Sequence, residues 1–149
     1  MLEASYQILV VEDDPILGNM LREILSDAGY RVRWAQDVIA ALSALEQQPV
    51  DLITLDIELG TYSGRGLLAL LKADPRTRDI SVIVVSSCQP DPDLCQMAQH
   101  VLSKPFNVAV LLQLVAASID GQGPACLARW QRAAANDKIG WEVAREILD

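Results

Sequence analysis

Four charged residues stand where short apolar runs of this sequence end. They are Glu12, Asp13, Asp56 and Lys104. Because α/β proteins place their chemistry at the carboxyl ends of strands, these side chains predict one shared site. Carboxylates gathered this closely repel one another unless a hard divalent cation with oxygen ligands, usually Mg²⁺, holds them ionised.

The same set of residue types indicates what the site could do. A bound Mg²⁺ can neutralise an incoming phosphoryl group, a lysine adds a positive charge, and a hydroxyl donates a hydrogen bond to the phosphoryl oxygens. Lys104 supplies the lysine, while Ser86 and Ser87 follow another apolar run and supply hydroxyls. The residues therefore predict phosphoryl transfer onto a carboxylate.

The apolar runs predict the strands that position these groups. Four runs are apolar without strict alternation, as expected for a parallel sheet covered on both faces: residues 8–11, 52–55, 82–85 and 101–103. Residues 30–34 alternate between apolar and basic side chains, which predicts a strand at the sheet edge. Five strands alternating with helices predict a doubly wound α/β fold.

Capping residues and apolar periodicity predict the helices between the strands. Helices are expected to begin after Asp14-Pro15, Asp37, Gly64 and Asn107, and Gly29 is expected to end the first. The side chains expected to face inward are Ile16, Leu17, Met20, Leu21, Ile24, Leu25 and Ala28 in the first helix, Val38, Ala41, Leu42 and Leu45 in the second, Leu67, Leu68, Leu70 and Leu71 in the third, and Val110, Leu111, Leu114 and Val115 in the last.

Four ordered motifs carry a resemblance to a known family. They are residues 8–15 (ILVVEDDP), residues 51–59 (DLITLDIEL) with Gly64 following, residues 84–87 (VVSS) and residues 103–106 (SKPF). Over roughly residues 5 to 120 the chain resembles the receiver domain of two-component response regulators. The resemblance implies the flavodoxin-like receiver fold, a five-stranded parallel sheet flanked by helices.

The resemblance also implies a metal site. Asp13 would bind Mg²⁺ directly together with Asp56, Glu12 would reach the ion through water, and Glu58 would contribute its backbone carbonyl. The Glu58 side chain would sit near the pocket, where it could repel a phosphoryl donor or attract a base of a partner.

Three residues, Asp56 among them, would act on the phosphoryl group. The resemblance implies that Asp56 is the phosphoacceptor, that Ser86 is the small hydroxyl residue that moves to contact the phosphoryl group, and that Lys104 pairs with that group. In this family the Lys104-Pro105 peptide bond is cis, a rare geometry that marks a fixed tight turn.

The sequence departs from the family pattern between Ser87 and Lys104, where the stretch is short. The fourth helix is therefore expected to be truncated to one or two turns. Val101 stands where many receivers have an aromatic switch residue, and Gly60 stands where a proline is common, so the loop after Asp56 is expected to be more mobile.

Composition limits the function classes. The formal net charge of −8 argues against a nucleic-acid surface, and 51% hydrophobic content excludes a disordered chain. No apolar stretch is long enough to predict a membrane span and no signal peptide is evident, so a cytoplasmic location is expected. The cysteines, Cys88, Cys95 and Cys126, match no zinc or redox spacing and read as buried or idle thiols, and His100 reads as an ordinary loop or strand-start residue.

The expected domain organisation is a receiver at residues 1–120, a linker at 121–124 and a helical extension at 125–149. Of the 20 acids and 12 bases, the extension and linker carry 4 of each, which leaves 16 acids and 8 bases in the receiver. The extension is too short for a winged-helix domain and has no basic excess for DNA. It is expected either to dock as a terminal helix or to form a partner-binding or dimerising hairpin around Trp130 and Trp141.

The function expected from these observations is a response regulator receiver that takes a phosphoryl group from a histidine kinase or histidine phosphotransfer protein. It would signal to an unidentified downstream protein, with a homodimer as one possibility, without a DNA-binding output, and without metabolic turnover. An alternative is a receiver-like interaction module that does not depend on phosphate. A haloacid-dehalogenase-type phosphatase using Asp56 and Glu58 ranks last, because the sequence lacks that family's second aspartate and following threonine.

Overall fold

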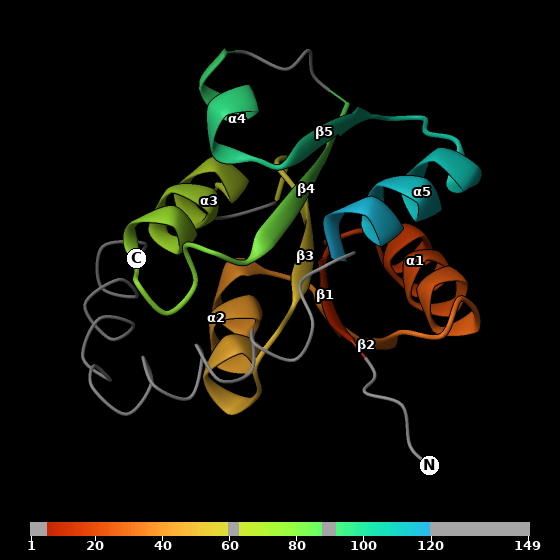
Figure 1. The fold of residues 1–149 in the computed structure, drawn as a ribbon, viewed down its shortest axis with the longest axis horizontal. Coiled ribbons are helices and arrows are strands. Elements are labelled where there is room, and N and C mark those ends of the chain that lie inside the picture. The colour runs from red at the N-terminus through yellow and green to blue at the C-terminus, as the bar shows by residue number, and fades with distance from the viewer. Residues whose placement is uncertain (1–5, 60–62, 88–91, 120–149) are drawn as a thin grey trace.

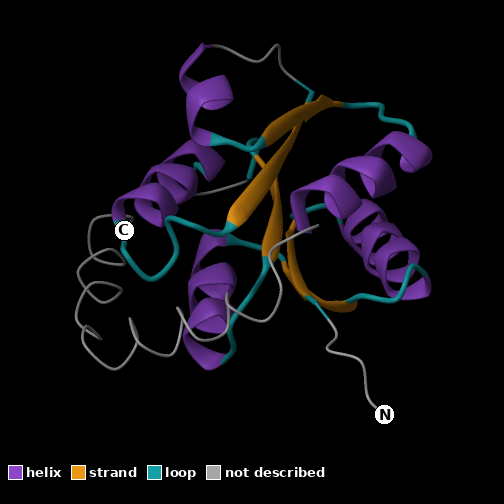
Figure 2. Cartoon of the chain, in the orientation of Figure 1, coloured by secondary structure: helices purple, strands orange, loops and turns teal. Residues whose placement is uncertain are grey.

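The computed structural model describes residues 6–59, 63–87 and 92–119. Five strands and five helices alternate through this part of the chain (Figure 1, Figure 2). In chain order they are β1 (Gln7–Val11), α1 (Pro15–Asp27), β2 (Arg31–Ala35), α2 (Val38–Gln47), β3 (Leu52–Asp56), α3 (Gly64–Ala73), β4 (Ser81–Ser86), α4 (Pro92–Met97), β5 (His100–Ser103) and α5 (Val108–Ile119).

The strands form one parallel sheet in the order β2-β1-β3-β4-β5. Every residue of β3 and β4 is buried, whereas β2 at the edge is largely half-exposed. The doubly wound five-stranded fold and the edge position of the alternating strand are both confirmed. Because all strands are parallel, their carboxyl ends lie along one edge of the sheet.

Helices cover both faces of the sheet. Figure 1 shows α1 and α5 on one side and α2, α3 and α4 on the other. Each layer closes its own apolar core, one around Leu21, Leu25 and Leu111 and the other around Leu42, Leu45 and Leu68. Among the described residues the two cores are separate clusters with the sheet between them, so the sheet is the rigid support for groups at its edge.

The predicted helix boundaries are confirmed, but part of the predicted inward face of α1 is wrong. The Asp14 side chain caps α1 by accepting a hydrogen bond from the Ile16 backbone N–H at 2.9 Å, and Gly29 follows the helix with φ of 103°. However, Ile16 is 80% exposed, Met20 is 40% exposed and Ala28 is exposed. Leu17, Leu21 and Leu25 already fill the stripe that faces the sheet, so Ile16 and Met20 lie beside it.

Predictions for the other helices hold with three exceptions. The expected inward residues of α2 are all buried, whereas Leu70 of α3 and Leu114 of α5 are half-buried and Val110 of α5 is 40% exposed. Asn107 caps α5 through a 2.8 Å bond from the Ala109 N–H to its side-chain oxygen. The truncation of the fourth helix is confirmed, since α4 has six residues.

Several predictions lie outside the described residues. These are the loop around Gly60, the reading of Cys88 and Cys126, the linker at 121–124 and the extension at 125–149. Among the helices that are described, none combines the length and apolarity needed to cross a membrane.

Candidate active site

Four strand ends bring the predicted site residues together. Glu12 and Asp13 follow β1, Asp56 ends β3, Ser86 ends β4, and Lys104 follows β5. Neighbouring strands in the order β1-β3-β4-β5 carry these residues to one edge of the sheet. Glu12 and Asp56 are almost fully buried there, at 1% and 3% exposure.

Lys104 joins the two buried carboxylates. Its Nζ lies 3.1 Å from Oε1 of Glu12 and 3.2 Å from Oδ2 of Asp56. The Lys104 backbone N–H donates to the Ser86 carbonyl at 2.8 Å, and the Lys104-Pro105 bond is cis, as predicted. The two ion pairs therefore hold the Lys104 ammonium over the pocket.

The carboxylates of Glu12, Asp13 and Asp56 form a candidate metal site. One oxygen of each lies within 4.8 Å of the others, with Glu12 and Asp56 buried and Asp13 exposed. An all-oxygen, anionic set with one open side suits Mg²⁺, which keeps several waters when it binds to proteins. The residues present therefore fit the ion that the acidic pattern predicts.

The electrostatics of the pocket agree with this fit. The pKa of Asp56 is raised to about 8, first by burial and then by the hydrogen bond with the Glu12 side chain and the negative charge of Glu12. The hydrogen bond from the Glu58 backbone and the positive charge of Lys104 lower this pKa but do not offset the rise. Burial lowers the pKa of Lys104, but Glu12 and Asp56 raise it further, so the net shift is upward. The positive charge of Lys104 alone does not balance the carboxylates of Glu12, Asp13 and Asp56. A divalent cation would supply the missing positive charge.

Glu12 is held by contacts that the sequence reasoning missed. The Trp34 indole N–H donates to the Glu12 carbonyl at 2.8 Å, and the Glu12 N–H donates to the Ala35 carbonyl at 3.0 Å. The Trp34 ring packs where a Cβ on Gly18 would stand, so only glycine fits at that position of α1. In the parallel register of β1 and β2, Trp34 pairs with Val10, two residues before Glu12. This register is the signal that could have placed Trp34 beside Glu12.

Gly64 fits closely against the acceptor strand. Its N–H donates to the Ile57 carbonyl at 3.2 Å, and a Cβ there would lie 2.5 Å from the Asp56 carbonyl oxygen and 2.7 Å from the Ile57 Cα. Backbone atoms cannot give way as a flexible side chain can. A side chain at this position would therefore displace the backbone of Asp56.

The Glu58 side chain does not join the acidic cluster. The Glu58 N–H donates to Oδ1 of Asp56 at 3.0 Å, but its carboxylate accepts hydrogen bonds from the Ser86 hydroxyl at 2.7 Å and from the Ser87 N–H at 3.1 and 3.3 Å. Sequence reasoning placed this side chain near the pocket but did not identify these contacts.

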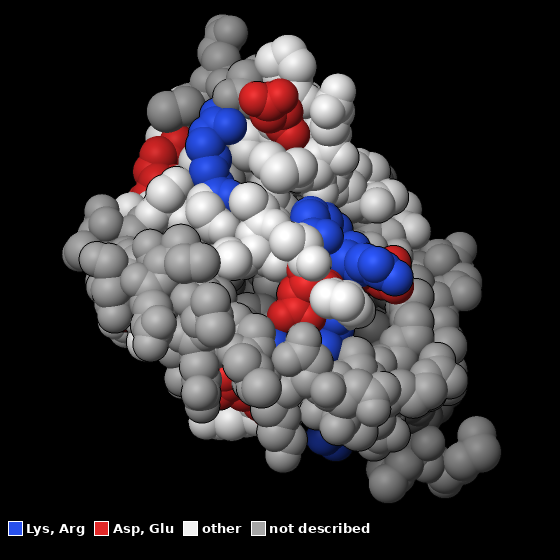
Figure 3. All heavy atoms as spheres, turned by 90° about the vertical axis from the view of Figure 1, so that its left-hand side faces the viewer, with Lys and Arg blue, Asp and Glu red and all other residues white. Residues whose placement is uncertain are grey.

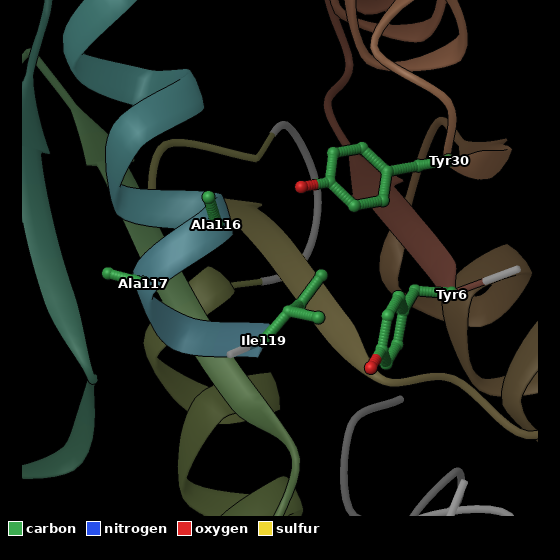
Figure 4. A pocket seen from close by; sticks show the side chains of 5 residues that line it. All are labelled: Tyr6, Tyr30, Ala116, Ala117 and Ile119. Carbon is green, nitrogen blue, oxygen red and sulfur yellow. The ribbon is translucent and has the colours of Figure 1, made fainter. Parts of the chain in front are cut away.

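A pocket and His100 lie at the opposite edge of the sheet. A pocket of about 380 Å³ is lined by Tyr6, Tyr30, Ala116, Ala117 and Ile119 (Figure 4). Tyr6 precedes β1 and Tyr30 precedes β2, so this pocket lies at the amino ends of the strands. His100 starts β5 at that same opposite edge, and Cys95 is a free, exposed thiol on α4.

Comparisons with known proteins agree with this geometry. The family model for the response regulator receiver domain matches residues 8–116. The DNA-binding dual master transcriptional regulator RpaA of Synechocystis sp. is 34% identical over 115 residues, which are 74% of this chain and 48% of that protein. The phosphate regulon transcriptional regulatory protein PhoB of Klebsiella pneumoniae is 32% identical over 115 residues, 74% of this chain and 50% of that protein.

A solved structure shares the fold. The receiver domain of a signal transduction histidine kinase from Syntrophus aciditrophicus is 28% identical with a TM-score of 0.72, over 80% of this chain and 93% of that one. The chain spans about half the length of the curated relatives named above. The match to the receiver model covers most of the chain, from β1 to α5, so this protein belongs to the response regulator receiver domain family.

Proposed function

We propose that this receiver takes a phosphoryl group from a phosphohistidine onto Asp56 in a Mg²⁺-dependent reaction. The observation that carries the proposal is the buried Asp56 carboxylate, which has Lys104 at 3.2 Å and the oxygens of Glu12 and Asp13 within 4.8 Å. Three clustered carboxylates beside one lysine repel one another unless a cation joins them. That cation would also neutralise a phosphoryl group placed on Asp56.

Each residue has a proposed role in the transfer. Asp13 and Asp56 would hold Mg²⁺, with Glu12 through water and Glu58 through its carbonyl oxygen, and the ion would neutralise charge on the phosphoryl oxygens. A carboxylate oxygen of Asp56 forms the new P–O bond while the P–N bond to the donor imidazole breaks, and the imidazole leaves with that electron pair. Lys104 keeps its proton and pairs with the transferred group.

The receiver would reset by hydrolysis. Water attacks phosphorus, the P–O bond to Asp56 breaks, and the carboxylate and inorganic phosphate are released. The domain catalyses only these steps on itself, by positioning and charge, and is not a turnover enzyme for small substrates.

An exposed apolar surface beside the site supports a protein donor. Ile16 and Met20 lie one turn apart on α1, which begins directly after Asp13 and Asp14, and both are exposed. Exposed apolar side chains beside a reactive carboxylate favour docking of a protein over capture of a small phosphate ester. The proposed partners are a histidine kinase or a histidine phosphotransfer protein, followed by a downstream protein that reads the phosphorylated surface.

Charge supports signalling through protein contacts. The 16 acids and 8 bases of residues 1–120 give the receiver no electrostatic attraction to nucleic acid, and residues 121–149 carry 4 of each. On the face formed by α2, α3 and α4, basic side chains are interspersed with acidic ones (Figure 3). The DNA binding named for RpaA is a property of that longer protein.

The test is the intact mass of the protein after incubation with Mg²⁺ and acetyl phosphate or a phosphorylated histidine donor. We expect the mass of one phosphoryl group to be gained by the native chain and not by Asp56→Asn. A gain that persists in Asp56→Asn would refute Asp56 as the acceptor. Mg²⁺ binding without a gain from any donor would instead favour the phosphate-independent interaction module.

A further inference from the structure

The hydrogen bonds around Glu58 concern the hydroxyl that phosphoryl transfer would use. Ser86 donates its hydroxyl to Oε1 of Glu58 at 2.7 Å, and the next residue donates its backbone N–H to both carboxylate oxygens at 3.1 and 3.3 Å. Two adjacent donors at the end of β4 therefore point at one carboxylate. A phosphoryl group on Asp56 would present acceptor oxygens of the same kind.

We propose that the Glu58 carboxylate is an internal competitor of the phosphoryl group. In the unphosphorylated receiver it occupies the donors of Ser86 and Ser87, and Ser86 must leave it before its hydroxyl can contact a phosphoryl group on Asp56. This inference rests on the proposed function and deepens it, since it names the contact that phosphorylation has to break.

Burial makes the two partners of Ser86 alternatives. Ser86 is 1% exposed, so its hydroxyl needs an acceptor within the protein. A serine hydroxyl has a single proton to donate, and a carboxylate and a phosphoryl group are both acceptors. The Ser86 hydroxyl can therefore donate its proton either to Glu58 or to the phosphoryl group, but not to both at once.

Chain geometry keeps the competitor close to the acceptor. The Glu58 N–H is fixed to Oδ1 of Asp56 at 3.0 Å, and Asp56 pairs with Val85, the residue before Ser86, in the sheet. The Glu58 side chain thus crosses from the end of β3 to the end of β4. Its negative charge also stands near the position that an anionic phosphoryl group would approach, so its displacement is favoured by repulsion once the group arrives.

The first test compares rates of phosphorylation by acetyl phosphate under saturating Mg²⁺. Glu58→Ala should accelerate phosphorylation about two- to tenfold, the range expected for loss of one net hydrogen bond to a buried group. Glu58→Gln, which keeps an acceptor oxygen without the charge, should give a smaller gain. The matched control is Glu46→Gln, an exposed acid near the carboxyl end of α2, which should leave the rate unchanged.

An unchanged or slower rate in Glu58→Ala would overturn the proposal. So would an equal acceleration in Glu46→Gln, which would assign the gain to overall charge. A side chain that merely supported the fold could lower the rate when removed, but it could not raise it.

A double-mutant cycle separates competition for the hydroxyl from simple repulsion. In a Ser86→Ala background the acceleration by Glu58→Ala should shrink, because the hydroxyl that Glu58 engages is already absent. An acceleration of the same size in both backgrounds would assign the effect to charge alone and overturn the competition.

A measurement without metal or donor tests the contact itself. The Ser87 amide proton should resonate downfield in the native protein and move upfield in Glu58→Ala, with Glu46→Gln unchanged. An amide that does not move would refute the contact. If the native chain takes up no phosphoryl group, the proposed function fails and the competition fails with it; if it is phosphorylated but Glu58→Ala is no faster, only the competition fails.

Discussion

The site has a buried floor, formed by Glu12 and Asp56, and an exposed rim, formed by Ile16 and Met20 at the start of α1. The two regions differ in opposite ways from the usual placement of polar and apolar residues. On the floor, the carboxyl-bearing Glu12 and Asp56 are buried at 1% and 3% exposure. On the rim, the apolar Ile16 is 80% exposed, although it follows Glu12 by only four residues. Both features reverse the usual preference for apolar residues inside and charged residues outside.

The difference indicates what each region is selected to do. A buried carboxylate costs stability, which the ion pairs with Lys104 offset only in part, and the proposed phosphoryl transfer would account for its retention. An exposed apolar side chain contributes little to folding, and the proposed docking of a protein donor would give Ile16 a role in recognition. Substitutions on the floor should therefore change both stability and chemistry, whereas substitutions on the rim should change only the transfer from a protein donor.

The largest expected effect is on the floor, at Asp56 in the metal-free protein. Its pKa rises from 3.8 to about 8 on folding, so between these values the folded state binds more protons than the unfolded state and stability falls as the pH rises. The Asp56→Asn variant cannot ionise at this position and so does not lose stability in this way. In urea titrations with a metal chelator, the unfolding free energy of the variant should exceed that of the native protein by on the order of a few kcal/mol at pH 8, and by little near pH 4.

Addition of Mg²⁺ provides the control for this prediction. The cation should stabilise the native protein more than Asp56→Asn at pH 8, because it binds the ionised carboxylate. A stability difference that does not change with pH would contradict the assignment of a raised pKa to Asp56.

A smaller effect is expected at the support of the floor. Trp34→Phe keeps a ring against Gly18 but removes the 2.8 Å hydrogen bond to the Glu12 carbonyl, at a cost of about 0.5–1.5 kcal/mol in stability. Mg²⁺ affinity measured by calorimetry should weaken, because the Glu12-Asp13 turn is less firmly held.

Arg22→Ala is the matched control for Trp34→Phe. The Arg22 guanidinium carbon lies 5.8 Å from the centre of the Trp34 ring and makes no contact with Glu12 among the hydrogen bonds described. Equal loss of Mg²⁺ affinity in both variants would attribute the effect to ring packing and not to the hydrogen bond.

The smallest effect on stability is expected at the rim. Ile16→Ser should change the unfolding free energy by less than about 0.5 kcal/mol, since the side chain is 80% exposed. It should nevertheless slow phosphoryl transfer from a histidine phosphotransfer protein while leaving the rate with acetyl phosphate unchanged. Equal slowing with both donors would remove the distinction between floor and rim.

Local patterns in the sequence were sufficient for the fold and for the residues that the structure brings together at one edge of the sheet. The apolar runs predicted β1, β3, β4 and β5, and the alternation of residues 30–34 predicted the edge strand, because strand burial leaves a direct record in side-chain polarity. The same runs end at Glu12, Asp56 and Lys104, which parallel pairing then brings together. Caps at Asp14 and Asn107 were readable because they depend on neighbouring backbone groups alone.

Predictions failed where burial depends on neighbouring elements. Periodicity placed Ile16, Met20 and Val110 on inward faces, but it cannot show how wide a stripe the sheet covers. The exposed rim of the site was missed for this reason.

The sequence by itself determined the class of the protein and the chemical groups of its site, because strand periodicity, turn residues and clustered carboxylates are written locally. Only the tertiary structure decided how those groups are engaged: Trp34 on Glu12, Lys104 between two buried carboxylates, and Glu58 on Ser86. These contacts join residues 22, 92, 48 and 28 positions apart, in the order given. Side-chain direction across such separations is set by packing of the whole sheet, which no local pattern records.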